Sequence, residues 1–544
     1  MLSPDIILSF ILGVSLHVFV LRRGEWDPAV PKMLATVGAS HLALCLGLVL
    51  RAKADLWSAV KTSSSLVATS ILGIYLSMLV YRAAFHRLNR FPGPFLARLS
   101  NFYFAGLTLK SYQEYIELQK LHRKYGDVVR IGEYIPEWHP SVHLLIESRG
   151  LDVCVKGPWY NTLLPEISVQ TERNVAQHAA RRRVWDKGFS TKALRNYESR
   201  VSHYTDKLIA YINAVEGKAM DASLWFNFYS FDVMGDLSLG KSFGMLDRGK
   251  EHYFMTTLHD FMLMVGIFGH IMWMFCFING LPVVSAGTAK FKGWIREMVQ
   301  KRMQEPPDVP DVFSWIIDEY KSHPQPTPQQ TLNLTADGIV ISIAGSDTTA
   351  AALTCLFLEL ATHPDITQKL QEELDALYQE NSAPDATALT RLEYLQACID
   401  EGLRLHPPVP AGVQRVTPPG GLHIGDDVYI PGDVIVKIPT YLLHRDERSF
   451  VRPDEFIPER WTSKPELIKN SAVYSPFSIG PYGCVGKQLA LMEIRGVTSR
   501  ILQKYDISLA PGQTKEAFFD GLVDGFTLAC PKLDLIFTPR AMKA

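Results

Sequence analysis

The sequence predicts a mainly α-helical fold with small β-sheets, an α+β architecture, behind an N-terminal helical membrane anchor. Three observations predict it. Three long apolar stretches open the chain, patterns with the 3.6-residue period of a helix dominate the remainder, and strand patterns are few and short. We therefore divide the 544 residues into an anchor, residues 1–90, and a large globular domain, residues 91–544.

The anchor is predicted from three uncharged stretches, residues 6–21, 33–50 and 62–81. The second and third match the ~20 apolar residues that cross a bilayer. The first is shorter, and a cleaved signal peptide is the alternative interpretation. No basic segment precedes it and no small-residue cleavage site precedes Arg22, which favours a retained helix.

The orientation of the anchor follows from the charges that flank it. An odd number of spans places the amino terminus and the globular domain on opposite sides of the membrane. The positive-inside rule then predicts a cytoplasmic globular domain, because four arginines follow the third stretch. Three basic residues between the second and third stretches oppose a three-span topology, so one or two spans remain alternatives. The arginines are Arg82, Arg87, Arg90 and Arg98, and the opposing residues are Arg51, Lys53 and Lys61.

Composition excludes two classes of function. The 55 basic and 56 acidic residues leave a net charge of -1, which provides no global field to attract nucleic acid. The seven cysteines are odd in number and widely spaced, without a CxxC pair, so we expect neither a disulfide framework nor a zinc finger. Six of them are interpreted as small buried hydrophobic residues.

The globular domain is predicted to contain more helix than strand. The helix patterns span Ser111–Tyr125, Asn174–Trp185, Asn196–Val215, Ala336–Thr362, Ile366–Tyr378, Leu395–Leu405 and Lys487–Tyr505. Strands are predicted at Val128–Ile131 and Val142–Ile146, and as a pair formed by Leu422–Ile424 and Val434–Ile438.

A further apolar run, Phe261–Ala289, holds 29 residues without Asp, Glu, Lys or Arg. Its length would permit another membrane span. His270, Asn279 and Pro282 oppose that interpretation, and the run lies within the globular sequence. We therefore expect a buried or membrane-dipping pair of helices.

The seventh cysteine, Cys484, lies in a turn-rich loop that leads into the helix pattern beginning at Lys487. Unpaired amides and the helix dipole favour a thiolate at that position. Gly480 and Gly486 leave room for a flat macrocycle against the backbone. Thiolate is the axial ligand that favours O–O cleavage on haem iron. A lone cysteine near a helix start is more often structural, but the spacing FxxGxxxCxG, which begins at Phe477, is far more specific.

A second motif, residues 344–349 (AGSDTT), lies inside the apolar helix pattern Ala336–Thr362. An acid beside an alcohol can relay protons to dioxygen, and Gly345 would let oxygen lie against the helix. The alternative interpretation is a locally capped or kinked helix. The candidate acid and alcohol are Asp347 and Thr348.

These motifs resemble the cytochrome P450 family in type and in order, from about Phe91 to Lys532. The residues after Cys484 look most like fungal microsomal members that tailor natural products. The resemblance implies the P450 fold and a haem b cofactor (iron protoporphyrin IX). It makes Cys484 the axial ligand of the iron, with Phe477 packed near the thiolate.

The resemblance also implies roles for the basic residues. His178, Arg182 and Arg415 would bind the two haem propionates. The family usually has a further base two residues before the cysteine, where this chain has Tyr482. A phenol can donate one hydrogen bond but carries no positive charge, which weakens that propionate contact. A buried structural charge triad would be formed by Glu401, Arg404 and Arg460.

By the same resemblance, the enzyme inserts one oxygen atom from dioxygen into a lipophilic small molecule of a secondary-metabolite pathway. Because no nucleotide-binding glycine motif is visible, a separate NADPH-dependent flavoprotein reductase would supply the electrons. The expected location is the endoplasmic reticulum membrane, with the catalytic domain in the cytoplasm. Substrate contacts would come from the segment before His178 and from residues 261–277, 339–348, 409–413 and around 526.

Two functions of other classes are the alternatives. A haem-thiolate isomerase or dehydratase would rearrange an oxygenated substrate without using dioxygen. Asp347 and Thr348 oppose it, since that chemistry needs no proton relay. A non-catalytic membrane or sterol-binding protein could keep the fold, but it would have no need of Cys484.

Overall fold

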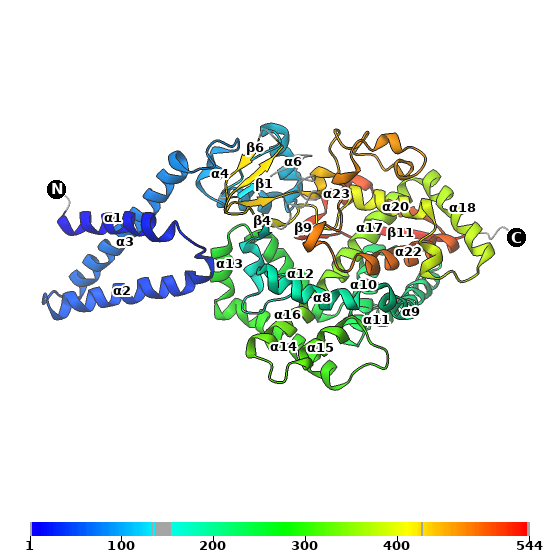
Figure 1. Ribbon diagram of the computed structural model, residues 1–544, viewed down its shortest axis with the longest axis horizontal. Helices are drawn as coiled ribbons and strands as arrows, with labels where there is room; N and C mark the ends of the chain where they lie inside the picture. Colours follow the sequence, from blue (N-terminus) through cyan, green and yellow to red (C-terminus); the bar gives the residue numbers. More distant parts are fainter. Residues whose placement is uncertain (1–2, 133, 137–153, 426–427, 541–544) are drawn as a thin grey trace.

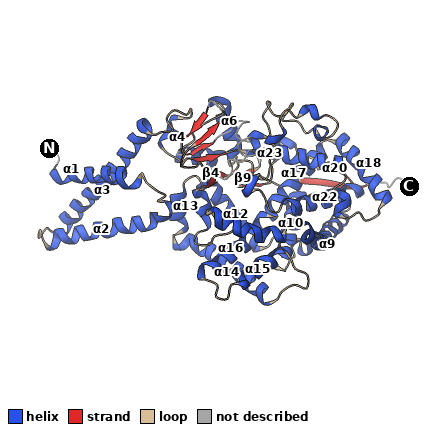
Figure 2. Ribbon diagram, viewed as in Figure 1, coloured by secondary structure: helices blue, strands red, loops and turns tan. Residues whose placement is uncertain are grey.

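Two consecutive helices, α16 (Pro328–Ala344) and α17 (Ser346–Thr362), run through the centre of the globular domain (Figures 1 and 2). The computed structural model describes residues 3–132, 134–136, 154–425 and 428–540. The central pair is long and apolar enough to cross a membrane, yet 78% of its most apolar window is buried inside the domain. It is a core element because it is hydrophobic on almost every side.

The main hydrophobic core packs around α17. Its other principal helices are α9 (Thr191–Val215), α10 (Ala222–Leu239), α20 (Glu393–Leu405) and α22 (Lys487–Lys504). Further helices cover this core: α5 (Phe102–Ser111), α6 (Glu114–Tyr125), α8 (Val175–Gly188), α15 (Val312–Ser322), α18 (Pro364–Glu380) and α23 (Lys515–Asp520).

The helix predictions are confirmed with one change. Six of the seven patterns appear as single helices, α6, α8, α9, α18, α20 and α22. The long pattern Ala336–Thr362 is instead divided between α16 and α17, with Gly345 at the break. The pattern did not locate the break because apolar residues recur at helical spacing on both sides of the polar residues 346–349.

The strands form small sheets. One has the order β1 (Tyr134–Pro136), β7 (Ile435–Lys437), β4 (Gln414–Val416), β2 (Val155–Lys156). Another has the order β3 (Ala219–Asp221), β11 (Asp534–Pro539), β8 (Tyr505–Leu509). Two hairpins complete them, β5 (Leu422–Ile424) with β6 (Val428–Ile430) and β9 (Val523–Gly525) with β10 (Thr527–Ala529).

The predicted pairing of Leu422–Ile424 with Val434–Ile438 is wrong. β5 pairs with the nearer β6, whereas β7 pairs with β1 and β4. The turn before β7 is bound to the residue that follows β4, because the Thr417 hydroxyl donates to the Pro431 carbonyl oxygen at 2.7 Å. Val128–Ile131 is not a strand in the described part of the chain, and Val142–Ile146 lies outside the described residues.

The apolar run Phe261–Ala289 extends over parts of three helices, α12 (Tyr253–Phe268), α13 (Met272–Asn279) and α14 (Pro282–Gln304). The expectation of a single pair was therefore too simple. α12 buries Leu258, Met262 and Val265, and α13 buries Met272 and Phe275. None of the three is a candidate span among the described helices.

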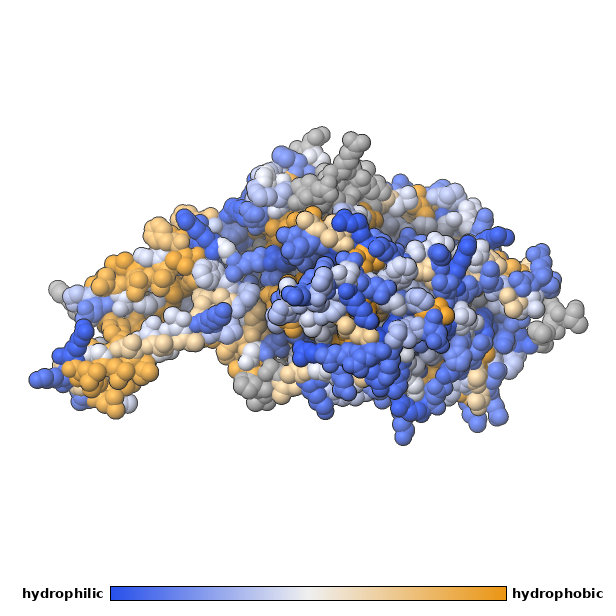
Figure 3. Space-filling view, turned by 60° about the horizontal axis from the view of Figure 1, so that its bottom comes forward, coloured by the Kyte–Doolittle hydropathy of each residue, from blue (hydrophilic) through white to orange (hydrophobic). Residues whose placement is uncertain are grey.

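The anchor is three helices that project from the globular domain (Figure 1), α1 (Pro4–Leu16), α2 (Val30–Leu50) and α3 (Leu56–Val80). Each belongs to a segment long and apolar enough to cross a membrane. Their exposed surface is mostly hydrophobic (Figure 3). α1 and α3 cross closely, because a Cβ added at Gly13 would lie 2.0 Å from the Ser70 carbonyl oxygen.

The loop between α1 and α2 returns to the globular domain. Glu25 in this loop forms a bidentate ion pair with Arg173, in which both N–O distances are 2.6 Å. The end of α3 also reaches the domain, where the Arg82 guanidinium donates to the Leu99 carbonyl oxygen at 2.9 Å. This loop and the end of α3 therefore lie on the same side of the anchor.

Candidate active site

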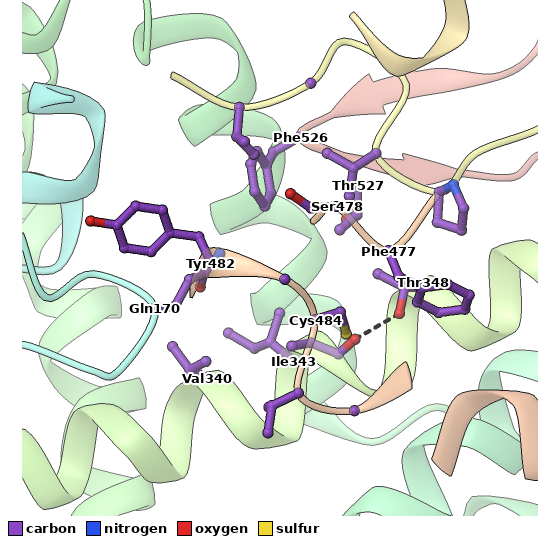
Figure 4. A pocket seen from close by; sticks show the side chains of 18 of the residues that line it. Gln170, Val340, Ile343, Thr348, Phe477, Ser478, Tyr482, Cys484, Phe526 and Thr527 are labelled. Carbon is purple, nitrogen blue, oxygen red and sulfur yellow. Dashed lines mark hydrogen bonds between the residues drawn. The ribbon is translucent and has the colours of Figure 1, made fainter. Parts of the chain in front are cut away.

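A cavity of about 470 Å³ lies between the α16–α17 pair and the loop that carries Cys484. Its lining is mostly apolar, with side chains from α12, α16, α17 and the turn between β9 and β10. Figure 4 shows Cys484 and Thr348 facing the same space, with Phe526 and Thr527 at its edge. Two motifs that are more than a hundred residues apart in sequence therefore meet at one cavity.

The Cys484 loop is held by local backbone geometry. The Cys484 amide donates to the Phe477 carbonyl oxygen at 2.8 Å, and Gly480 has φ of +70°. This left-handed conformation favours glycine, so Gly480 shapes the turn. Gly480 is not part of the cavity lining, whereas Gly486 is. A Cβ added at Gly486 would lie 3.9 Å from the Cys484 sulfur.

The Cys484 side chain lines the cavity and is accessible from it. Burial away from bulk water raises the pKa of its thiol. The amides of Gly486 and Lys487 and the charge of Arg182 oppose this rise without overcoming it. The helix N-terminus alone therefore does not hold a thiolate here, in contrast to the expectation from sequence. A bound iron would supply the missing positive charge.

Basic residues gather at one end of the cavity around the ring of Tyr482. Lys156 Nζ and Arg415 Cζ each lie 4.9 Å from the centre of that ring, and the His178 ring centre lies 4.8 Å away. Arg182 donates to the Gly483 carbonyl oxygen at 2.5 Å. Tyr482, two residues before Cys484, thus serves as a surface for cation–π contacts.

This basic cluster suits an anionic group. Burial and the nearby Arg415 lower the pKa of Lys156 to about 7. Burial and Lys156 lower the pKa of His178 to about 4. Mutual repulsion of this kind is relieved when carboxylates bind between the cations. Lys156 was missed by the sequence reasoning, because a single lysine before Gly157 carries no recognisable pattern.

The break between α16 and α17 places the second motif. A Cβ added at Gly345 would lie 2.5 Å from the Met234 sulfur of α10, so glycine permits this close packing. Thr348 lines the cavity, and its hydroxyl donates to the Ala344 carbonyl oxygen at 2.7 Å (Figure 4).

Asp347 is turned away from the cavity, which it does not line. Its Oδ1 lies 3.2 Å from His259 Nε2 of α12. The Asp347 side chain is 7% exposed and that of His259 is 40% exposed. Burial lowers the pKa of His259, but the hydrogen bond and charge of Asp347 more than compensate, so the pKa lies above its usual 6.5. His259 connects the buried acid to solvent, a relationship that sequence patterns did not show.

The charged residues predicted to act structurally meet behind the Cys484 loop. Glu401 accepts from the guanidinium groups of Arg404 and Arg460, each at 2.8 Å, and from Trp461 Nε1 at 2.9 Å. The side chains of Glu401, Arg404 and Arg460 are 0% exposed. Because the network is fully buried, loss of any one partner would leave a buried charge without its counter-charge.

Most of the predicted site residues share one cavity. Those that line it are His178, Arg182, Thr348, Arg415, Phe477, Cys484 and Gly486. The predicted substrate segments also contribute, through Phe261, Met262, Val265, Val340, Ile343, Val409, Val413 and Phe526. Residues that sequence reasoning missed are Lys156, Tyr160 and Glu493 in the lining and His259 beside Asp347.

The family is decided by comparison with known proteins. The model of the family described as Cytochrome P450 matches residues 156–537. The chain belongs to the cytochrome P450 family. This cytochrome P450 is 48% identical to "Cytochrome P450 monooxygenase FCK2" of Fusarium pseudograminearum, over 98% of this chain and 97% of that protein. It is 35% identical to "Tryprostatin B 6-hydroxylase" of Aspergillus fumigatus, over 97% of this chain and 95% of that protein.

Solved structures show the same fold. The cytochrome P450DA heme domain superposes with a TM-score of 0.69 at 19% identity, covering 80% of this chain and 95% of that one. The residues present also fit a haem, since an uncovered cysteine and a buried basic cluster lie along one cavity. The predictions of fold, family and monooxygenase class are confirmed, and the enzyme is a haem-dependent oxidoreductase that uses dioxygen and a redox partner.

Proposed function

We propose that this cytochrome P450 binds haem b through Cys484 and inserts one oxygen atom from dioxygen into a lipophilic secondary metabolite. One observation carries the proposal, namely that Cys484 and Thr348 face one mostly apolar cavity with a basic cluster at one end. The names of the fungal relatives, among them a tryprostatin B 6-hydroxylase, support a natural-product substrate. When bound, the haem supplies the activation of dioxygen and the oxygen transfer.

The chain's own residues hold the cofactor in this proposal. The Cys484 sulfur ligates the iron, with Phe477 packed beside it. Lys156, His178, Arg182 and Arg415 bind the propionates, and Tyr482 orients Lys156 and Arg415 by its ring. The apolar lining excludes water from the substrate and leaves few polar groups to compete for it.

Protons reach the cavity along α17 in this proposal. His259 takes a proton from solvent at its exposed ring and shares it with Asp347 Oδ1. Asp347 would then turn from His259 toward the cavity and pass the proton on through the hydroxyl of Thr348, the next residue in the chain. The Thr348 oxygen lines the cavity and can accept a proton there, and its own hydrogen would leave the Ala344 carbonyl oxygen when the hydroxyl donates into the cavity.

The redox partner is proposed to be a separate NADPH-dependent flavoprotein reductase. The exposed bases Arg183 and Lys187 of α8 and Lys487 of α22 flank the Cys484 loop and offer a positive docking face. Residues 91–544 form the catalytic domain and residues 1–90 the anchor.

The anchor is proposed to cross the endoplasmic reticulum membrane three times, with the catalytic domain in the cytoplasm. The ion pair between Glu25 and Arg173 supports this topology, because it holds the first loop of the anchor on the side of the catalytic domain. Arg22, Arg23 and Lys32 then join Arg82 on the cytoplasmic side, as the positive-inside rule requires.

The ligand assignment is tested by the absorption spectrum of the reduced protein with carbon monoxide. We expect the band of a thiolate-ligated haem in wild type and its loss in Cys484→Ala, because only a bound thiolate gives this band. The matched control is Cys276→Ala, which removes a cysteine of α13 outside the cavity lining. A band that survives in Cys484→Ala would refute the assignment.

The reaction class is tested by co-expressing the enzyme with a fungal reductase and feeding candidate metabolites under ¹⁸O₂. A monooxygenase gives a product that carries one ¹⁸O atom. An isomerase or dehydratase gives an unlabelled product, and a sterol-binding protein gives no product. An anchor-deleted enzyme that acted only on small polar compounds would contradict a lipophilic substrate.

A further inference from the structure

A second cavity, of about 30 Å³, adjoins the main one. Five residues line both cavities: Trp159, Val265, Gly412, Val413 and Phe526. The two spaces are therefore separated by a single layer of residues. The rings of Trp159 and Phe526 stack within this layer, with centres 4.4 Å apart and planes inclined by 26°. We call the smaller cavity the annex.

The annex differs from the main cavity in polarity. Its remaining lining includes four titratable side chains: Glu114 of α6, Lys437 of β7, Asp524 of β9 and His270 of the loop after α12. Burying four such groups beside an apolar substrate cavity is costly unless each has a partner.

Three of the four groups satisfy one another. Glu114 forms a short ion pair with Lys437 and accepts from His270 Nε2 at 3.1 Å. Burial opposes ionisation of Glu114, but Lys437 and His270 lower the pKa of this carboxyl to about 2. The charges of Glu114 and Lys437 therefore cancel, and neither needs a further ligand.

Asp524 is the exception. Its Oδ1 accepts from the Phe526 amide at 3.3 Å, and the Tyr115 amide also favours the ionised carboxylate, whereas Oδ2 is buried and accepts no hydrogen bond within the described residues. The residue is only 4% exposed. β9 holds it in place, because the Asp524 amide donates to the Tyr112 carbonyl oxygen at 2.7 Å. A buried acceptor without a donor at the edge of a cavity points to a ligand that supplies one.

We propose that the annex is a substrate subsite in which Asp524 Oδ2 accepts a hydrogen bond from an N–H or O–H group of an otherwise apolar substrate. The proposal rests on the function proposed above and narrows its substrate class to lipophilic molecules with one remote donor. A volume of about 30 Å³ admits a group the size of a hydroxyl or an amine. A turn of the Phe526 side chain would connect the annex to the main cavity, since that ring borders both.

The annex would favour an amine over a hydroxyl. Lys437 is paired with Glu114 and offsets the charge of Asp524 only in part. Burial and the charge of Glu114 raise the pKa of Asp524 to about 7, and a cationic donor would stabilise the ionised form.

The test uses 1-alkylimidazoles that end in a methyl, a hydroxyl or an amino group, in a series of chain lengths. The imidazole nitrogen binds the haem iron and shifts the Soret band, so affinity is read without turnover. At one chain length we expect the amino and hydroxyl probes to bind wild type about tenfold more tightly than the methyl probe. Asp524→Leu should abolish this preference, because it removes both acceptor oxygens at similar volume.

The matched control is Asp520→Leu, the same change at an exposed position at the end of α23. It should keep the wild-type preference. Asp524→Asn retains an acceptor oxygen without the charge, so it should lose the amino preference and keep the hydroxyl preference. This variant decides the question if Asp524→Leu does not accumulate haem.

Two results would overturn the proposal. Equal affinities of the three probes at every chain length would show that the annex holds only a buried water. The proposal also fails if Asp524→Leu keeps the preference of wild type, because a group other than Asp524 must then accept the hydrogen bond. Failure of the haem assignment is distinguishable, because the reduced protein with carbon monoxide would then lack the band of a thiolate-ligated haem and every probe would fail to shift the Soret band.

Discussion

His259 Nε2 lies 3.2 Å from Asp347 Oδ1, so the buried acid of the α17 motif is paired with a partly exposed imidazole of α12. The pair couples a side chain inside the fold to solvent through one hydrogen bond. It also brings together α12 and α17, which both line the cavity. Glu251 and Asp260 add negative charge near His259.

Replacing His259 should make stability depend differently on pH. Because the folded pKa of His259 lies above its usual 6.5, the proton stabilises the folded state. That contribution is complete below about pH 6.5 and is lost as the pH rises through the folded pKa. The unfolding temperature of His259→Gln should therefore fall below that of wild type by more at about pH 6 than at about pH 9.

Thermal unfolding followed by tryptophan fluorescence measures this difference. The control is His323→Gln. The His323 side chain is 45% exposed, and its contact with Glu319 is long, at 4.0 Å. A difference between wild type and His259→Gln that is independent of pH would contradict the pairing. Product formed per NADPH consumed should also fall in His259→Gln if the pair delivers protons.

Lys156 should hold haem and make the haem-free protein sensitive to pH. Its folded pKa of about 7 lies below the usual 10.5, so the unfolded chain binds more protons between these values. Haem-free protein should gain stability as the pH rises from about 7 to about 10, and bound propionates should flatten this dependence.

Haem transfer to excess apomyoglobin measures how strongly Lys156 holds the haem. Lys156→Gln should lose haem about tenfold faster than wild type, because one charge-assisted hydrogen bond to a propionate is removed. Lys187→Gln on the exposed side of α8 is the control and should behave as wild type. Equal rates for both variants would exclude Lys156 from the propionate site.

Glu401→Gln should strongly destabilise the domain. It leaves the guanidinium groups of Arg404 and Arg460 buried without their counter-charge, at a cost of about 3 to 5 kcal/mol. Urea unfolding of the haem-bound protein measures the loss. Glu466→Gln, at an exposed position, should change stability by less than about 0.5 kcal/mol. A small effect of Glu401→Gln would show that the network does not act as a unit.

Gly345→Ala should disturb the break between α16 and α17. The new methyl group would lie 2.5 Å from the Met234 sulfur, so a shift of α10 or α17 is required. We expect a destabilisation of about 1 to 3 kcal/mol, as for overpacking elsewhere. Met234→Ala removes the clash, and the double variant should recover part of the loss beyond additivity.

The matched control for this prediction is Gly496→Ala in α22, where an added Cβ meets nothing within 4 Å. Alanine has a higher helix propensity than glycine, so stability should be equal or slightly higher. Thermal unfolding and the carbon monoxide spectrum together report the outcome. A Gly345→Ala enzyme as stable as wild type would show that the close packing against Met234 is not required.

Local patterns predicted much of the fold. The anchor and the helices α6, α8, α9, α18, α20 and α22 were predicted correctly, because apolar length and helical periodicity depend only on neighbouring residues. The short strands were predicted less well. The pairing of β7 with β1 joins segments about three hundred residues apart, which no local pattern encodes.

The sequence by itself determined the family and the residue expected to hold the iron, since the loop around Cys484 has its distinctive spacing within ten residues. Only the tertiary structure decided what surrounds that residue. It turned Asp347 toward His259 and Thr348 toward the cavity, and it packed Lys156 and Arg415 on the Tyr482 ring. It also placed Asp524 behind the wall formed by Trp159 and Phe526. Side-chain direction and partners depend on contacts between distant segments, which exist only after the helices have packed.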